Sequence, residues 1–268
     1  MDTGKARAGA KAGARAGIGI GIGIGIGIAT GGAACADDRP VVSVTYYDYP
    51  PTMQVVAGQP VGPHVTAMER LADVAGLRID WVASSVADEA RLLDDGQRQI
   101  CTTGRTYRSD RADRWAYIPY EWDRLPGDVV VAAPAYAARA KAHAHLRDLL
   151  TDKSLSGLFV QSTTFGDEID RAVGWQAHWV ANDAKSEIQT IRMIAAGRAA
   201  YTVITEDQWI AARRAHPETR SLEAFRIEGV YPPAPIFLTC SRAIPGPVLQ
   251  ALADAMKSLG YKRADFIP

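Results

Sequence analysis

The chain has 268 residues, of which 47% are hydrophobic and 22% are charged. This composition is typical of a globular protein, and the length suits one large domain or two modest lobes. The 30 basic and 30 acidic residues cancel, so no net field attracts the chain to nucleic acid or to an anionic membrane surface. Neither is expected as a partner.

The first 36 residues have the layout of a secretory signal. Four basic residues are followed by an uncharged run over residues 16–36, which ends in Ala34-Cys35-Ala36. Small residues in an A-x-A pattern before Asp37 are typical of a signal-peptidase site, so residues 1–36 are expected to be a signal peptide that export removes. The expected location is therefore periplasmic or secreted.

Two alternatives for this segment remain open. The uncharged run is long enough to span a bilayer as an uncleaved anchor, although its repeated Gly-Ile pairs favour a helix poorly. Residues 32–35 are also similar to a lipoprotein cleavage box, in which Cys35 would become the lipidated first residue of the mature chain. Cleavage after Ala36 instead leaves 26 basic and 29 acidic residues, and only Cys101 and Cys240 in a compartment that permits disulfides.

The mature chain begins with a strand–helix alternation. Hydrophobic spacing predicts strands over residues 41–46, 79–82 and 99–103, and helices over residues 65–75 and 87–93. Strand, helix, strand, helix, strand is the pattern of a parallel α/β sheet.

A second unit of the same kind follows. Strands are predicted over residues 157–161, 178–181 and 201–205, with helices over residues 135–150, 165–172 and 186–196. A strand over residues 236–240 and a helix over residues 248–259 end the chain. Two lobes with two chain crossings explain this order most simply, and such lobes can close a cleft around a ligand. One continuous doubly wound domain is the alternative.

No motif indicates catalysis, a cofactor or a metal. The sequence has no G-x-S-x-G, no G-x-x-x-x-G-K and no H-E-x-x-H. His143 and His145 are two positions apart, so on a helix they point in different directions. No cofactor, no metal site and no enzymatic activity are expected.

Several segments, taken in order, resemble family 3 of the bacterial extracellular solute-binding proteins, the receptors of polar amino acid uptake. The matching segments are VTYYDYPP at 44–51, Gly62 with LADVAGL at 71–77, Gly104, Thr106 and Arg111 with Pro119-Tyr120, VQSTT at 160–164, and AGR at 196–198. The similarity extends from residue 41 to about residue 261. Arg108 stands where the family has Thr, Ala200 where it has Asp, and the acid that holds a ligand amino group corresponds only loosely to Glu206-Asp207.

This resemblance implies the two-lobed α/β fold of type II periplasmic binding proteins, with two parallel-type sheets joined by two hinge strands. The first lobe is expected over residues 37–132 and 227–268, and the second lobe over residues 133–226. Cys101 and Cys240 then lie on strands of the same lobe and are expected to form a disulfide. Two buried thiols are the alternative.

The resemblance assigns ligand binding first to Arg111, because a guanidinium offers a planar fork that matches a carboxylate. Arg105 and Arg114 are treated as neighbours on a solvated face. The other expected ligand contacts are Gly104, Thr106, Asp48, Tyr49, Trp122, Glu206 and the Ser162-Thr163-Thr164 loop. Core packing of the aromatic residues, helix capping by the hydroxyl groups and an Asx turn at Asp48 are the alternatives.

The function that follows is capture of a small polar, carboxylate-bearing, amino-acid-like solute for an ABC-type transporter. The partners expected are the solute and a membrane permease or sensor, and the protein is expected to be a monomer. Two alternatives stay open: an enzyme similar to cyclohexadienyl dehydratase, with Glu206 as general acid, and a binding module that signals to a membrane partner.

Overall fold

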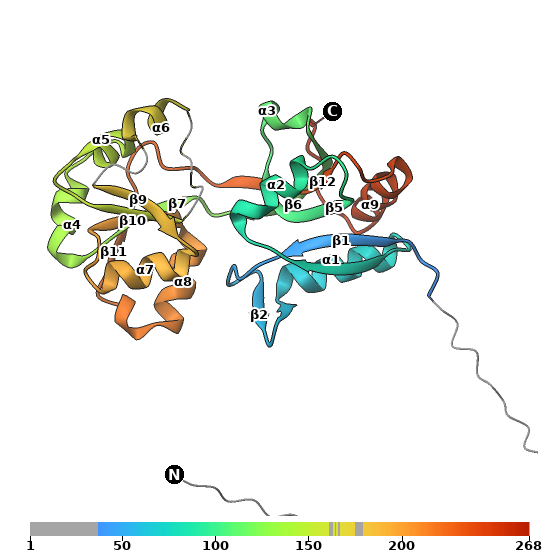
Figure 1. Cartoon of the computed structure of the whole chain (residues 1–268), viewed down its shortest axis with the longest axis horizontal. Helices are drawn as coiled ribbons and strands as arrows, with labels where there is room; N and C mark the ends of the chain where they lie inside the picture. Colours follow the sequence, from blue (N-terminus) through green and yellow to red (C-terminus); the bar gives the residue numbers. More distant parts are fainter. Residues whose placement is uncertain (1–36, 161–162, 164, 166, 175–178, 268) are drawn as a thin grey trace, which may run out of the picture. The chain divides into compact units, whose positions relative to one another are not determined.

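Two five-stranded sheets, each packed against helices, make up most of the described chain (Figure 1). The computed structural model describes residues 37–160, 163, 165, 167–174 and 179–267. The expected signal peptide over residues 1–36, with Cys35, lies outside the described residues. Both sheets belong to one unit of packing that runs from Arg39 to the C-terminus.

The first sheet has the strand order β4-β1-β5-β12-β6. The strands are β1 (Val41–Tyr46), β4 (Arg78–Ala83), β5 (Ile100–Thr106), β6 (Trp115–Leu125) and β12 (Ala234–Ser241). Strand β1 runs parallel to β4 and β5, as the strand–helix alternation predicts. Strand β12 is antiparallel to both β5 and β6, so the sheet is mixed rather than purely parallel.

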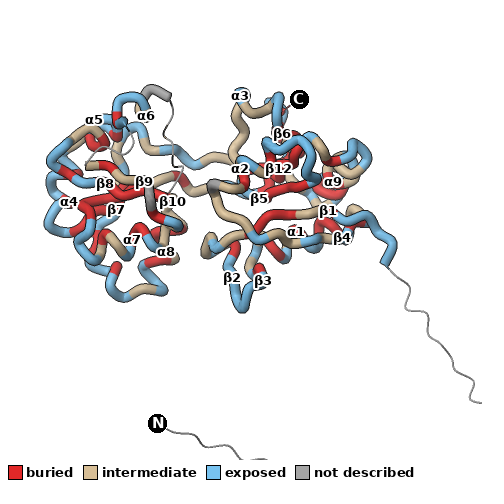
Figure 2. Tube along the Cα trace, in the orientation of Figure 1, coloured by how far each residue is buried: buried red, intermediate tan, exposed pale blue. Residues whose placement is uncertain are grey.

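Three longer helices and one short one pack on this sheet. They are α1 (Pro63–Val74), α2 (Val86–Asp94), α3 (Ser109–Ala112) and α9 (Gly246–Ser258). Met68 and Leu71 of α1 and Leu252 and Met256 of α9 are fully buried against the strands. These positions are three or four residues apart, which is the spacing that places side chains on one helix face. Figure 2 shows the buried residues concentrated along the strands.

A small hairpin, β2 (Gln54–Val56) and β3 (Gln59–Val61), precedes α1. It meets the helix at Gly62, whose φ of 126° is unfavourable for residues with a side chain. A Cβ at this position would also lie 2.7 Å from the carbonyl oxygen of Thr52. Glycine is therefore required where the chain turns into α1.

The second sheet has the order β11-β7-β10-β8-β9. Its strands are β7 (Asp128–Ala132), β8 (Gly157–Val160), β9 (Val180–Ala184), β10 (Tyr201–Thr205) and β11 (Glu223–Phe225). The helices are α4 (Pro134–Lys141), α5 (Leu146–Thr151), α6 (Asp167–Val173), α7 (Glu187–Ala195) and α8 (Glu206–Ala215), followed by the 3-10 turn η1 (Pro217–Thr219). Strands β8, β9 and β10 are parallel, while β7 is antiparallel to β10 and β11.

The single helix predicted over residues 135–150 is wrong, because the chain forms α4 and α5 with a break between them. At the break, His145 is extended and bridges Glu228, and the backbone N–H of Leu146 donates to the carbonyl of Glu228. Pairing with a segment more than eighty residues later interrupts the helix, which local spacing does not reveal.

Two chain segments connect the sheets and run side by side. The first passes through Pro126-Gly127, and the second covers residues 226–233. The N–H of Asp128 donates to the carbonyl of Tyr231 at 2.9 Å, and a Cβ on Gly127 would lie 2.9 Å from that same oxygen. The guanidinium of Arg226 donates to the carbonyls of Asp128 at 3.1 Å and Pro126 at 3.2 Å. Close backbone contact therefore couples the two segments.

Cys101 and Cys240 form the expected disulfide. The two residues lie directly opposite each other on β5 and β12, with their Cα atoms 4.0 Å apart, and both are fully buried. The bond closes a loop with a sequence separation of 139. It therefore ties the returning strand to the first sheet.

In the part of the chain that the structure describes, each helix is too short or too polar to cross a bilayer.

We expect replacement of both cysteines by alanine to lower the free energy of unfolding by about 2–5 kcal/mol, because a long loop in the unfolded chain is no longer constrained. Urea denaturation with and without reductant measures the change. The double variant provides its own control, because reductant should shift only the wild-type midpoint. Wild-type protein with two titratable thiols at these positions would contradict the prediction.

Candidate functional site

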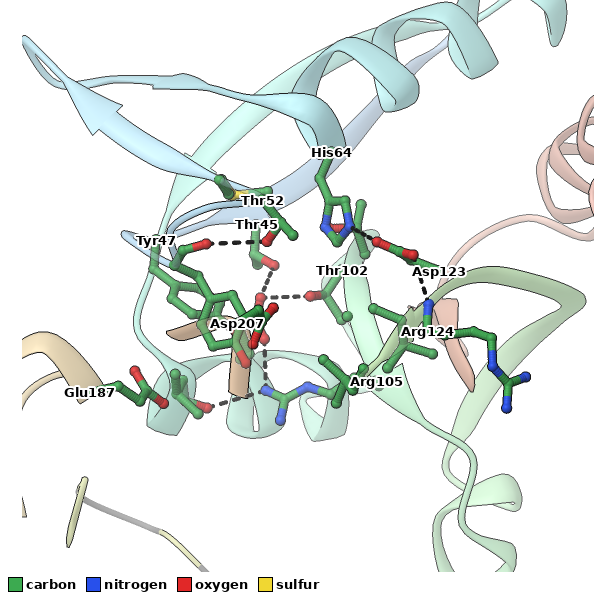
Figure 3. A pocket seen from close by; sticks show the side chains of 18 residues that line it. Thr45, Tyr47, Thr52, His64, Thr102, Arg105, Asp123, Arg124, Glu187 and Asp207 are labelled. Carbon is green, nitrogen blue, oxygen red and sulfur yellow. Dashed lines mark hydrogen bonds and ion pairs between the residues drawn. The ribbon is translucent and has the colours of Figure 1, made fainter. Parts of the chain in front are cut away.

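A cavity of about 200 Å³ is lined by several charged and hydroxyl side chains (Figure 3). Most of its lining comes from the first sheet, the loop that follows β1, and helices α1 and α2, while Glu187 and Asp207 come from α7 and α8. The remaining lining residues are Thr45, Tyr47, Tyr49, Thr52, Met53, His64, Val86, Glu89, Thr102, Thr103, Gly104, Arg105, Asp123, Arg124, Leu125 and Ile236. Both halves of the fold therefore contribute to one site.

A buried carboxylate, Glu89, organises the wall formed by the first sheet. Its side chain is only 2% exposed. The hydroxyls of Thr45 and Thr102 donate to its Oε1 at 2.5 and 2.6 Å, and Arg105 binds its Oε2 at 2.7 Å. These donors satisfy both oxygens, which is the condition under which a charge can be buried.

Arg105 is held inside the site and does not face solvent. Its side chain is 16% exposed, and Nη2 donates both to Glu89 and to the carbonyl of Val86 at 3.2 Å. Its Nε is buried and has no hydrogen-bond partner within the described residues. The expectation that Arg105 belongs to a solvated face is therefore wrong, since the buried acid of α2 draws it inward.

Two tyrosines form an aromatic wall. The rings of Tyr47 and Tyr49 lie edge to face, with centroids 5.8 Å apart, and both line the cavity. The hydroxyl of Tyr49 is 3.2 Å from the hydroxyl of Thr205, at the end of β10. Burial raises the pKa of both phenols.

The second sheet contributes unpaired negative charge. Glu187 is the first residue of α7 and Asp207 the second residue of α8, so both acids lie in first helical turns, where the helix dipole favours an anion. Burial, with a smaller effect from Asp207, raises the pKa of Glu187. No ion pair joins either carboxylate to a cation in the described part of the chain, although Asp207 accepts the N–H of Gln208.

A smaller cavity of about 140 Å³ adjoins this site through two shared residues, Tyr49 and Glu187. It is also lined by Asp128, at the start of β7. Burial raises the pKa of Asp128 to about 7, opposed by Arg226 and reinforced by the negative charges of Asp207 and Glu187. The carboxyl groups of Asp128, Glu187 and Asp207, from three different elements, therefore lie close enough to interact electrostatically at these two cavities.

The two halves also touch beside the cavity. Gln208 of α8 is fully buried, and its side-chain amide donates to the carbonyl of Pro50 in the loop after β1. Together with the Tyr49–Thr205 contact, this bond spans the two sheets. The side-chain Oε1 of Gln208 has no hydrogen-bond partner among the described residues.

Some expected ligand residues lie at the cavity and others do not. Gly104 and Tyr49 line it, and Thr163 lines the adjoining smaller cavity, whereas Ser162 and Thr164 lie outside the described residues. Thr106 pairs in the sheet with Ile236, a lining residue, but does not itself line the cavity. The structure thus brings together only part of the expected set.

Three other expected residues have partners elsewhere. Trp122 is buried and stacks on Tyr261 with ring centroids 5.7 Å apart. Asp48 is exposed and accepts the N–H of Val55 at 3.3 Å. Glu206 forms an ion pair with Arg226 at 2.8 Å, beside the crossing segments.

Arg111 lies on the short helix α3 and outside the lining of both cavities. Its guanidinium is 4.9 Å from the centre of the Trp115 ring, a cation–π distance. Burial and the neighbouring Arg108 lower its pKa. In this arrangement the guanidinium contacts an aromatic ring and not the cleft.

Sequence reasoning did not identify Glu89, Glu187 or the inward position of Arg105 as parts of the site. Glu89 and Glu187 both lie in the first turn of a helix, where the helix dipole makes an acid an ordinary residue. Only the alignment of α2 on the sheet shows that Glu89 points inward. Within the described residues, no group of three or more His, Cys, Asp or Glu side chains is arranged to hold a metal ion.

No protein-family model and no curated protein matches this sequence. Solved structures do match its fold. A histidine kinase sensor domain similar to periplasmic binding proteins aligns with a TM-score of 0.64 and 17% identity, covering 84% of this chain and 98% of that one. An arginine-, lysine- and histidine-binding protein from Geobacillus stearothermophilus aligns with a TM-score of 0.59 and 15% identity, covering 82% and 90%.

An ancestral amino-acid-binding protein, a precursor of cyclohexadienyl dehydratase, also aligns, with a TM-score of 0.60 and 16% identity over 82% of this chain and 88% of that one. At these identities the similarity concerns the fold. The chain has the two-lobed α/β fold of periplasmic binding proteins, as the sequence resemblance implies.

We expect Arg105→Ala to lower the free energy of unfolding by about 3–5 kcal/mol, because it leaves the carboxylate of Glu89 buried without its cation. The matched control is Arg114→Ala, whose side chain is 53% exposed and pairs with Asp94 at the surface. That change should cost less than about 1 kcal/mol. Equal effects of the two substitutions in urea denaturation would contradict the structural assignment.

We expect the Asp128 carboxyl to make the protein less stable as the pH rises. Its native pKa of about 7 lies above the ordinary value of 3.8, so the native state binds this proton more tightly than the unfolded state does. The stabilising effect is complete below pH 4 and is lost as the pH approaches 7. Asp128→Asn should remove this pH dependence, which amounts to roughly 4 kcal/mol between pH 4 and pH 7.

Urea denaturation of wild type and Asp128→Asn at intervals from pH 4 to pH 8 provides the test. The comparison between the two curves cancels the contribution of the other titrating groups. Parallel curves would show that the folded and unfolded pKa values of Asp128 are the same.

Proposed function

We propose that this protein is an extracytoplasmic solute-binding protein that captures a small polar solute in the cavity and presents it to the membrane permease of an ABC-type transporter. The observation that carries the proposal is the origin of the cavity walls. A rigid, internally paired wall comes from the first sheet, and unpaired carboxylates come from α7 and α8 of the second. A solute between them would make contacts that neither half makes alone, so its binding would favour the closed arrangement.

The crossing segments support this mechanism. Two adjacent backbone segments join the halves, and Arg226 links them by hydrogen bonds to backbone carbonyls. Hinge closure concentrates dihedral change in a few residues at the ends of elements. Gly127, with its positive φ of 89°, lies at such a place.

A carboxylate group on the solute, held by Arg111, is the finer proposal that the family resemblance supplies. In the described arrangement Arg111 is over Trp115, so this role requires the guanidinium to leave the ring and turn toward the solute. The surface position of α3, with no fully buried residue, makes such a movement physically accessible.

Signalling to a membrane partner is the second candidate. The histidine kinase sensor domain is matched over 98% of its length, so this chain contains essentially the whole of that domain's fold. Binding and closure would be common to both roles. The dehydratase alternative requires Glu206 as an acid in the site, whereas Glu206 forms an ion pair with Arg226 and lies outside the cavity lining.

We expect a solute of the right class to raise the melting temperature. Binding to the native state alone adds about 2.7 kcal/mol to the free energy of unfolding when the ligand is at a hundred times its Kd. Thermal-shift screening of the purified protein against amino acids, small organic acids and oligoamines measures this, with calorimetry to confirm each hit. A screen with no stabilising compound would count against the proposed function.

If Arg111 anchors a carboxylate, Arg111→Ala should weaken binding of a carboxylate-bearing hit by about thirtyfold or more, since a desolvated ion pair is lost. Arg114→Ala, in the same segment and paired with Asp94, should change the Kd by less than about threefold. Calorimetry on the two variants decides the question. Unchanged binding by Arg111→Ala would remove Arg111 from the site without affecting the proposed capture of a solute.

A further inference from the structure

We infer that the solute is a small organic cation, held by the carboxylates of Glu187 and Asp207 beside the rings of Tyr47 and Tyr49, and that a carboxylate group on the solute is dispensable. This inference rests on the proposed function, because it specifies the solute of the same cavity. The sequence predicts a carboxylate-bearing solute. The structure favours a cation, because the cations of the site are already paired and two of its acids are not.

The positive charges of the lining are all paired. Arg105 is neutralised by Glu89, whose position two threonine hydroxyls fix. Arg124 binds Glu121 at 3.1 Å, and in Figure 3 its guanidinium points away from the other lining side chains. The Nε of Arg105 has no partner among the described residues, but the charge of Arg105 is already balanced by Glu89, so a solute carboxylate there would add an uncompensated negative charge.

The negative charges are not all paired. Asp123 has His64 as a partner at 2.9 Å. Glu187 and Asp207 have no cationic partner among the described residues. Burial raises the pKa of Glu187, which means that the described residues do not compensate its charged form. An ammonium or guanidinium group would supply that compensation and the missing hydrogen-bond donors.

Each acid alone has a simpler explanation, because acids are favoured in first helical turns by the helix dipole. That effect explains neither their shared position on one cavity nor the composition of the opposite wall. Tyr47 and Tyr49 present aromatic rings, and aromatic rings attract cations through their quadrupole. Two independent features, the unpaired acids and the tyrosine wall, therefore favour the same ligand charge.

The volume is suited to a small solute. About 200 Å³ accommodates a chain of a few carbon atoms with one or two charged ends. Unbranched diamines and guanidinoamines fit this description. They also carry two positive charges, equal in number to the unpaired acids.

Matched pairs that differ only in the carboxylate group test the inference directly. The probes are agmatine with arginine, cadaverine with lysine, and putrescine with ornithine, and glutamine and glutamate serve as solutes without a net positive charge. Calorimetry on the purified protein should show that the amine of each pair binds at least as tightly as its amino acid. Glutamine and glutamate should bind at least about tenfold more weakly.

Two variants locate the charge. Glu187→Gln and Asp207→Asn should each weaken binding of the tightest amine by about tenfold or more, because each removes one partner of a desolvated charge pair. Glu218→Gln is the matched control, since Glu218 is an exposed acid of the same half that pairs with Arg192 and does not line the cavity. It should change the Kd by less than about threefold.

The outcomes separate the two proposals. Binding that requires the carboxylate, or that favours glutamine or glutamate over the amines, would overturn the cation inference and leave the solute-binding function intact. Amine binding that is insensitive to both variants would overturn the assignment to Glu187 and Asp207. If none of the eight probes binds, the cation inference fails, and the broader screen then decides whether the solute-binding function fails with it.

Discussion

The insertion of β12 between β5 and β6 is the constraint on which the rest of the structure depends. It brings the end of the chain back to the sheet where the chain began, and the Cys101–Cys240 bond fixes that return. Because the chain returns, it must cross between the sheets a second time. The second crossing lies beside the first, where the contacts of Gly127 with Tyr231 and Pro233 leave no room for a side chain. A hinge made of two adjacent backbone segments follows from one strand's place in a sheet.

The same sheet explains how a charged residue can be buried in the site wall. Glu89 points from α2 toward β1 and β5, which supply Thr45 and Thr102, while Arg105 follows at the end of β5. Desolvating an ion pair costs free energy, and hydrophobic residues of similar size are often equally stable. The pair therefore contributes little to stability in itself. Its consequence is positional, since it holds the guanidinium in a fixed place and removes its charge from the balance of the cavity.

How much could be predicted from the sequence differs between the fold and the site. The strands over residues 41–46 and 201–205 were correctly placed, because runs of β-branched residues between turns are a local signal. Strand β6 was missed although it is the longest among the described strands, since Pro119 interrupts its pattern. Helix α8 was missed because its apolar face is small, with Trp209 and Ala212 buried. The break between α4 and α5 depends on Glu228, which is distant in sequence.

The site was harder to predict because its members are defined by orientation and not by residue type. Arg105 and Arg111 are six positions apart in one arginine-rich segment, yet one is drawn toward a buried acid and the other toward Trp115. A motif match identifies the segment but cannot say which guanidinium meets an acid, because that depends on the position of α2.

The charge balance of the cavity follows from the same difference. A family pattern that places an arginine at position 111 implies a free cation for a carboxylate. Arg111 does not line the cavity in this structure. Arg105 does, but it is already paired with Glu89, so the first sheet presents a nearly neutral wall. The first turns of α7 and α8 present two acids to that wall, and these helices start there because β9 and β10 end there. On our proposal, the solute's charge is therefore selected by the helices that begin at the cavity, and the sheet opposite them serves as a support.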